Sequence, residues 1–251
     1  MYYRRNLFIF LIATTLLVSS IYIGSFRISI ASLNRCILYG NNSSIRKYEK
    51  SITQFRNIVG SNPLEVAIEA TNKEAFSLLL QLGADPHSRD RSGLPIIHRA
   101  CTIADSFWLE QVLKHNGDPN LMWPGNRAYR PQRPMYVAME SRQFHLVPIL
   151  VDAGASLTDA IMSDRNADYS PLGNASDCGP EGVATVLYLL EKGAIPDLTR
   201  PSSSITAFVQ DGDDAPWRRP ITKWFREHGM DLHKKYWDGS KWVIPSYEVS
   251  R

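Results

Sequence analysis

Apolar residues along this chain gather in short runs that stop abruptly at a glycine or an asparagine. In "SLLLQLGADP", residues 77–86, three leucines are followed within three residues by Gly83. Gly83 can end a helix because only a residue without a Cβ adopts the left-handed conformation at low cost. The same ending returns in "QVLKHNGDP", "PILVDAGAS", "LYLLEKGAI" and "FREHGMDL". The pattern therefore predicts a repeated helix that stops at the same point of each unit.

Both ends of the repeated unit keep a regular spacing. Asp85 and Asp118 are 33 residues apart, and the later endings follow at intervals of 36 to 39 residues. Each unit opens on a related stretch: "NPLEVA" at 62–67, "PIIHRA" at 95–100, "RPMYVA" at 133–138 and "SPLGNA" at 170–175. A capping Asn or Ser before a proline is typical of a helix start. Each unit is thus a predicted helix pair that must stack on its neighbours to bury its apolar face.

The start and the end of the unit resemble those of the ankyrin-repeat family, which has a period of 33, a Thr-Pro-Leu-His-x-Ala start and a Gly-Ala-Asp end. The resemblance covers most of residues 32–233. It implies an all-α ankyrin-repeat solenoid of about five to six helix-turn-helix repeats with β-turn fingers. Two departures stand out. Asn116 replaces a terminating glycine, which is a mild change, and the finger "MWPGNRAYRPQR" is longer than the consensus.

The N-terminal segment predicts a membrane anchor. Residues 7–25 hold no charged side chain and lie between Arg5 and Arg27. Nineteen helical residues are about 28 Å long, close to the hydrocarbon thickness of a bilayer. We expect a cytoplasmic N-terminus at 1–6, a transmembrane signal anchor at 7–25 and export of the rest. The alternative is a signal peptide that is cleaved near Ser25.

The remaining segments divide by the strength of the repeat. Residues 26–60 are interpreted as an N-terminal capping repeat, and residues 61–233 as ankyrin repeats with a degenerate C-terminal cap. In the C-terminal hairpin and tail, 234–251, Asp238-Gly239 favours a two-residue hairpin turn. The tryptophans near the C-terminus either cover the end of the stack or bind a partner.

Charge and chemistry exclude several classes of function. The chain has 28 Lys+Arg against 25 Asp+Glu, which is no nucleic-acid footprint. Its three cysteines lie in different repeats, about two repeat widths apart at ~10 Å each, so no disulfide is expected. His228 and His233 do not share a helix face, and no nucleophile elbow or phosphate loop occurs. We predict neither catalysis, nor a cofactor, nor a metal site.

A partner-binding surface remains. The family resemblance implies that finger tips and first helices line the concave face that grips partners. Trp, Tyr and Arg are the residue types enriched at binding hot spots. In the long finger, an exposed Trp beside Tyr and Arg has no core to serve, which favours binding. The candidate binding residues are Arg89, Arg91, Trp123, Arg127, Tyr129, Arg130, Arg133, Arg165 and Tyr169.

Ankyrin repeats behind an N-terminal anchor resemble a group of bacterial immunity proteins that are paired with toxins, notably phospholipase effectors delivered by type VI secretion. The resemblance implies a single-pass inner-membrane protein whose repeats, in the periplasm, bind and inhibit a secreted phospholipase. A scaffold or adaptor for another envelope protein is the alternative. A eukaryotic membrane-tethered adaptor is a third possibility.

Overall fold

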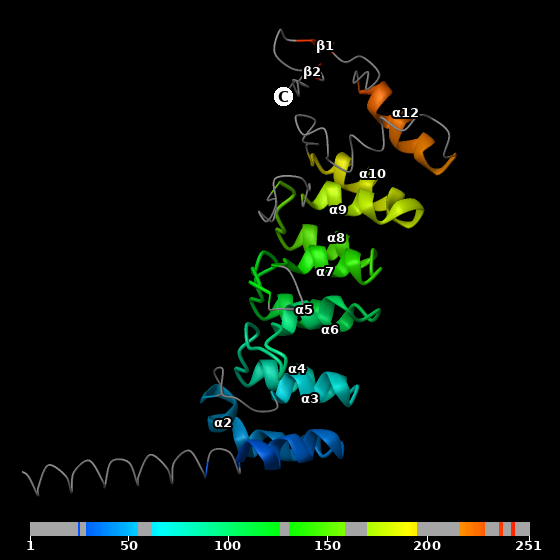
Figure 1. Cartoon of the computed structure of the whole chain (residues 1–251). Helices are drawn as coiled ribbons and strands as arrows, with labels where there is room; N and C mark the ends of the chain where they lie inside the picture. Colours follow the sequence, from blue (N-terminus) through cyan, green and yellow to red (C-terminus); the bar gives the residue numbers. More distant parts are fainter. Residues whose placement is uncertain are drawn as a thin grey trace, which may run out of the picture. The chain divides into compact units, whose positions relative to one another are not determined.

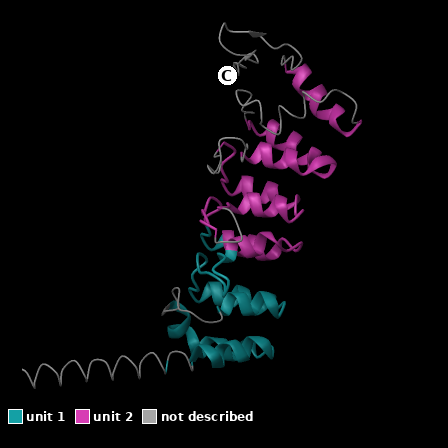
Figure 2. Ribbon diagram, in the orientation of Figure 1, with its two compact units in different colours: residues 1–96, 114–117 teal, residues 97–113, 118–251 magenta. Residues whose placement is uncertain are grey.

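The computed structural model describes residues 25, 29–54, 62–125, 131–158, 170–194, 216–228, 236–237 and 242–243. The chain divides into two compact units (Figure 2). Unit 1 comprises residues 1–96 and 114–117, and unit 2 comprises residues 97–113 and 118–251.

Unit 1 is built from short helices arranged in antiparallel pairs (Figure 1). A helix at residues 29–38 is followed by η1 (Asn42–Tyr48), α2 (Glu49–Gln54), α3 (Pro63–Glu69) and α4 (Lys73–Gln81). The side-chain oxygen of Asn62 accepts a hydrogen bond from the Leu64 N–H at 2.9 Å, which caps α3. Asn72 caps α4 in the same way through the Ala75 N–H, at 3.0 Å. The predicted helix starts thus have a direct cause in the capping residues.

Unit 2 continues the same pairing. Its elements are α5 (Ile96–Cys101), α6 (Phe107–Lys114), α7 (Pro134–Glu140), α8 (Leu146–Asp152), α9 (Pro171–Asp177), η2 (Gly179–Gly182), α10 (Val183–Glu191), η3 (Pro216–Arg218), α12 (Arg219–Glu227), β1 (Tyr236–Trp237) and β2 (Trp242–Val243). Helices α7 and α8 form one pair and α9 and α10 the next, with α7 against α9 and α10 against α12. The start of α5 and the end of α6 lie in unit 1.

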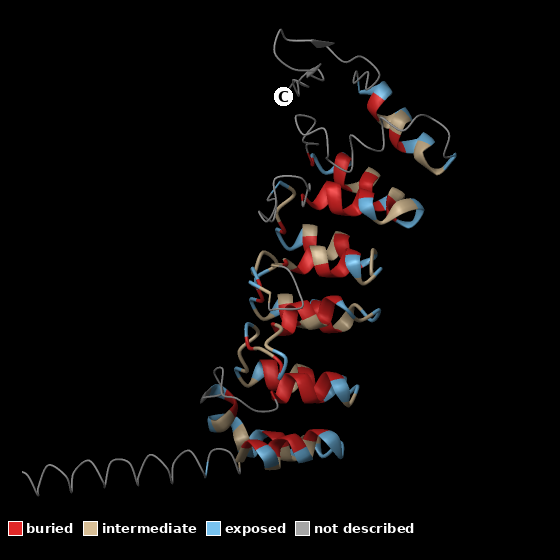
Figure 3. Cartoon of the chain, viewed as in Figure 1, coloured by how far each residue is buried: buried red, intermediate tan, exposed pale blue. Residues whose placement is uncertain are grey.

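Burial follows the apolar positions of each helix pair. Figure 3 shows the buried residues along the helices and the exposed ones at many of the helix ends and turns. Ala67 in unit 1 and Ala138 and Ala175 in unit 2 are fully buried. An alanine at this point allows neighbouring helices to approach closely. Phe76 and Phe225 are the largest of the fully buried side chains in the described part of the chain.

The recurring helix ending is confirmed in four of the five predicted units, and the fifth, at Gly229, lies outside the described residues. Gly83, Gly154 and Gly193 have φ of 87°, 91° and 91°, and each follows the second helix of a pair. Asn116, which replaces the glycine, has φ of 65°, so it adopts the same left-handed conformation. The position therefore requires a left-handed residue rather than a glycine in particular.

The predicted two-residue turn near the C-terminus is wrong in length. Strands β1 and β2 pair antiparallel, with Tyr236 opposite Val243 and Trp237 opposite Trp242. Four residues, 238–241, therefore separate the last paired positions. A two-residue turn at Asp238-Gly239 would place Trp237 opposite Ser240 instead.

The predicted anchor at 7–25 lies outside the described residues, apart from Ser25. Within the part of the chain that the structure describes, no helix has both the length and the apolar character needed to span a membrane.

Candidate functional site

The base of the long finger is closed by a pair of backbone hydrogen bonds. The Trp123 N–H donates to the Gln132 carbonyl and the Gln132 N–H to the Trp123 carbonyl, both at 2.9 Å. The two residues thus form an isolated antiparallel bridge. The bridge determines where the finger leaves the helices and where it returns.

Trp123 packs inward from this bridge, so the expectation that it is exposed is wrong. Trp123 is only 5% exposed, and its ring packs edge to face against the His98 ring, with the ring centroids 6.4 Å apart. His98 is fully buried, and its Nε2 lies 3.1 Å from the Gln132 carbonyl oxygen. Because a carbonyl oxygen only accepts, Nε2 carries the proton. Trp123 has a core to serve, and the main argument for it as a binding residue is lost.

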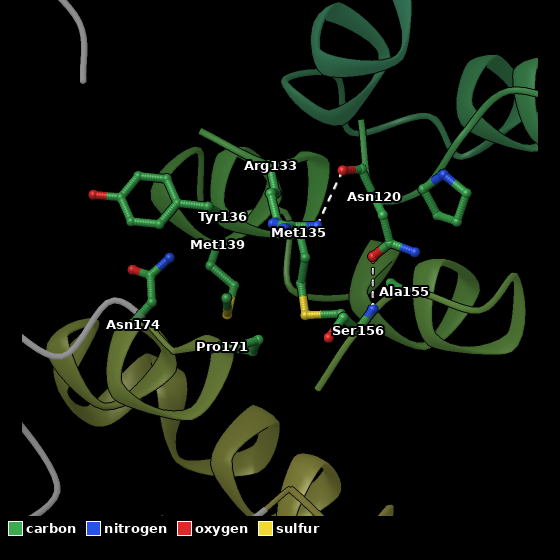
Figure 4. A pocket seen from close by; sticks show the side chains of 10 residues that line it. Asn120, Arg133, Met135, Tyr136, Met139, Ala155, Ser156, Pro171 and Asn174 are labelled. Carbon is green, nitrogen blue, oxygen red and sulfur yellow. Dashed lines mark hydrogen bonds between the residues drawn. The ribbon is translucent and has the colours of Figure 1, made fainter. Parts of the chain in front are cut away.

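Arg133 ties the same finger to the following repeat (Figure 4). Its Nη1 donates to the Asn120 carbonyl at 3.1 Å. The Asn120 side chain in turn accepts from the Ser156 N–H at 2.8 Å and donates to the Gly154 carbonyl at 2.9 Å. Arg133 is half-buried. Its guanidinium therefore bonds to the loop that follows α6 and also reaches the surface.

The finger of unit 1 is held in shape by Asp90. Its Oδ1 accepts from the Ser92 N–H at 2.8 Å and from the Leu94 N–H at 2.9 Å. Arg89, a predicted binding residue, donates through Nη1 to the Gly93 carbonyl at 2.9 Å. The side chain of Arg89 therefore stabilises its own turn.

Arg91 fastens this finger to α3. Its Nε donates to Glu65 Oε1 at 2.8 Å and its Nη2 to Glu69 Oε2 at 2.6 Å. The hydrogen bond to Glu65, followed by the charges of Glu65 and Glu69, raises the pKa of the Arg91 guanidinium. The Arg91 side chain is 57% exposed, whereas that of Glu65 is only 3% exposed. A partner that takes Arg91 away would leave a buried carboxylate without its cation, which is costly.

Glu65 is a residue that the sequence interpretation missed. It occupies the place that His98 has in the next repeat, the fourth position of the opening hexapeptide in "NPLEVA". A carboxylate at a buried family-histidine position is a visible departure, and it indicates that a cation must lie nearby.

Five predicted binding residues lie outside the described residues and stay predictions: Arg127, Tyr129, Arg130, Arg165 and Tyr169. Of the others, the structure places Arg89 and Arg91 on one finger of unit 1. It places Trp123 and Arg133 at the base of the long finger in unit 2.

A hollow lies between α7 and α9 in unit 2, beside the loops that follow α6 and α8 (Figure 4). The hollow offers about 20 Å³ to the centre of a water-sized group, within an open depression of about 310 Å³ that includes solvent space. It is lined by Pro119, Asn120, Arg133, Met135, Tyr136, Met139, Ala155, Ser156, Pro171 and Asn174. Arg133 is thus a predicted site residue that also borders a concave surface.

The chemistry of reactive groups is sparse in the described part of the chain. Cys36, Cys101 and Cys178 are all free thiols. Complete burial raises the pKa of the Cys101 thiol far above its usual range. Burial also raises the pKa of Cys178, although the nearby Arg142 charge opposes it. Among the described residues, no three His, Cys, Asp or Glu side chains are grouped so that they could hold a metal ion.

The helix pairs, the left-handed stops and the bridged fingers together define the ankyrin-repeat fold. The structure is similar to the crystal structure of an ankyrin repeat domain from Acinetobacter baumannii AYE, with a TM-score of 0.55 and 21% sequence identity. The match covers 68% of this chain and 86% of that one. Comparisons with models of protein families and with curated proteins found no match. At this identity the likeness shows the fold alone.

Proposed function

We propose that this chain is a protein-binding module that presents its fingers and first helices to a partner. The observation that carries the proposal is the fixed geometry of the finger bases. Side-chain contacts hold the described finger bases against their helices, through Glu65 and Arg91 in unit 1 and through His98 and Trp123 in unit 2. A preorganised surface binds with less loss of conformational entropy. Ankyrin-repeat arrays offer extended surfaces of this kind.

We further propose that the partner is a secreted phospholipase-type toxin and that the chain is its immunity protein. The support comes from the sequence: an apolar segment at 7–25, an Arg-rich long finger that also carries Tyr129, and the resemblance to anchored ankyrin immunity proteins. In this proposal, residues 7–25 anchor the chain in the bacterial inner membrane and the repeats face the periplasm. The bound repeats block the substrate entrance of the toxin stoichiometrically, with slow dissociation setting the affinity.

Competition between sibling cells tests the immunity role. Cells that lack this gene should be killed by siblings that carry the gene of the paired toxin, and the full chain supplied from a plasmid should rescue them. Deletion mutants that compete normally would overturn the immunity role and leave an envelope adaptor. As a control, siblings that carry a toxin with an inactivated active site should not kill the deletion mutant.

A fusion experiment tests the topology separately. Alkaline phosphatase fused after residue 60 should be active, because that enzyme folds only after export, and the fusion should sediment with membranes. A soluble mature form that begins near Ser25 would show instead that residues 7–25 are a cleaved signal peptide.

A further inference from the structure

The hollow between α7 and α9 contains a buried polar group without a partner. Asn174 is 8% exposed, and its Nδ2 makes no hydrogen bond within the described part of the chain. Asn174 lines the hollow, and its amide nitrogen is turned toward Met139 (Figure 4). A buried donor without an acceptor lowers the stability of the fold. The cost indicates that this amide serves something other than folding.

The equivalent positions of other repeats show that the fold does not need an amide here. Aligning "SPLGNA" with "NPLEVA" and "RPMYVA" places Asn174 opposite Val66 and Val137. Both valines are buried, at 5% exposed each, on α3 and α7. A valine is therefore compatible with this position of the helix pair.

The walls of the hollow indicate the chemistry of its occupant. Met135, Met139 and Pro171 offer apolar contact suited to methylene groups. Asn174 Nδ2 requires an acceptor, and the Arg133 guanidinium supplies a positive charge to the same hollow. The described residues that line it include no carboxylate.

We propose that this hollow is a subsite for one acidic side chain, glutamate or aspartate, of the bound partner protein. The carboxylate accepts from Asn174 Nδ2 and lies in the field of Arg133, and the methylene stem contacts the two methionines. A hydrogen bond to a charged acceptor is stronger than one to a neutral acceptor, so the subsite selects an acid over an amide. The proposal rests on the proposed protein-binding function, because the acidic side chain belongs to the partner.

Methyl NMR of the full chain in detergent micelles tests the subsite without the partner. The chain has six methionines, and methyl labelling of methionine gives one signal for each. The probes are N-acetyl-glutamate N-methylamide and the matching glutamine compound. The glutamate probe should shift the Met135 and Met139 signals, with roughly tenfold higher affinity than the glutamine probe. Met122, which is outside the lining, should not move.

Two variants complete the test. Asn174→Val should abolish the response to the glutamate probe while the melting temperature stays unchanged or rises, because an unpartnered donor is removed. Ser176→Ala is the matched control on the same helix, since its hydroxyl is buried but already donates to the Leu172 carbonyl at 2.9 Å. It should retain the probe response.

The outcomes separate this proposal from the proposed function. Equal shifts with both probes, or none at Met135 and Met139, would overturn the acidic subsite whether or not the toxin binds. A clear fall in melting temperature for Asn174→Val would also overturn it, because the amide would then have a partner within the chain. If the deletion mutants survive the sibling-competition assay, the toxin is not the partner, but the probe result still supports the acidic subsite.

Discussion

Replacing Trp123 by alanine should destabilise unit 2 substantially. The indole is 5% exposed and lies edge to face on His98. Burial of an aromatic side chain removes about 150–250 Å² from water, which at about 25 cal/mol per Å² is an upper limit of about 4–6 kcal/mol. Measured losses for Trp→Ala in cores are about 3–5 kcal/mol. We expect about 3 kcal/mol, because the residue lies at a finger base rather than in the middle of a helix pair.

The assay is urea unfolding of the full chain in detergent, followed by far-ultraviolet circular dichroism. Because repeat arrays can unfold in parts, hydrogen exchange at the Gln132 amide should be measured as well. This amide donates to the Trp123 carbonyl and should lose protection in the variant. Met122→Ala is the control, since Met122 is next in sequence but 37% exposed, and it should change stability by less than about 0.5 kcal/mol.

A loss below about 1 kcal/mol for Trp123→Ala, with normal protection of Gln132, would refute the reasoning. The indole would then be a surface side chain, and Trp123 would again be a candidate binding residue. If the packing is correct, any loss of partner binding in this variant reports a displaced finger. Tyr129 and Arg130 are the better choices for testing contact with the partner.

Three further predictions concern stability, each measured by urea unfolding. Asn62→Ala should cost about 2–3 kcal/mol, because the α3 cap and the amide donor to the Ser88 hydroxyl are both lost. Gly83→Ala should cost about 1 kcal/mol at its φ of 87°, whereas Asn116→Gly should change stability little. Burial raises the pKa of the Cys101 thiol, so the unfolded chain releases this proton first as pH rises. Stability should then fall by about 1.4 kcal/mol per pH unit above roughly pH 8.5, and Cys101→Ala should remove that part of the slope.

The fold could be predicted because its determinants are local and repeated. Each helix start depends on a cap and a proline within a few residues, as at Asn62, and each ending depends on one left-handed residue. The same short pattern recurs along the chain, so an irregular member such as Asn116 could be identified by its place in the period. Local rules of this kind hold whatever the tertiary contacts are.

The site was harder to predict because its side chains are paired over long distances in the sequence. Trp123 lies 25 residues after His98, and Arg91 lies 26 residues after Glu65. Composition alone cannot show whether a Trp or an Arg in a finger contacts a partner or the next helix, because the same residue types serve both roles. The predicted length of the C-terminal hairpin turn was wrong for a related reason, since a turn dipeptide does not specify how the flanking strands pair.

The error at the long finger has a functional consequence. Trp123, which looked available to a partner, is instead an anchor of its finger base, whereas Arg91 anchors its finger through Glu65 and keeps a side chain that is 57% exposed. An anchored finger loses little conformational freedom when it binds, so its remaining surface residues can contribute more to affinity. Asn174 differs from these anchors, because its amide is buried and yet makes no hydrogen bond within the described chain. The anchors are thus already used within the chain, whereas the Asn174 amide is the donor that the proposed acidic subsite would use.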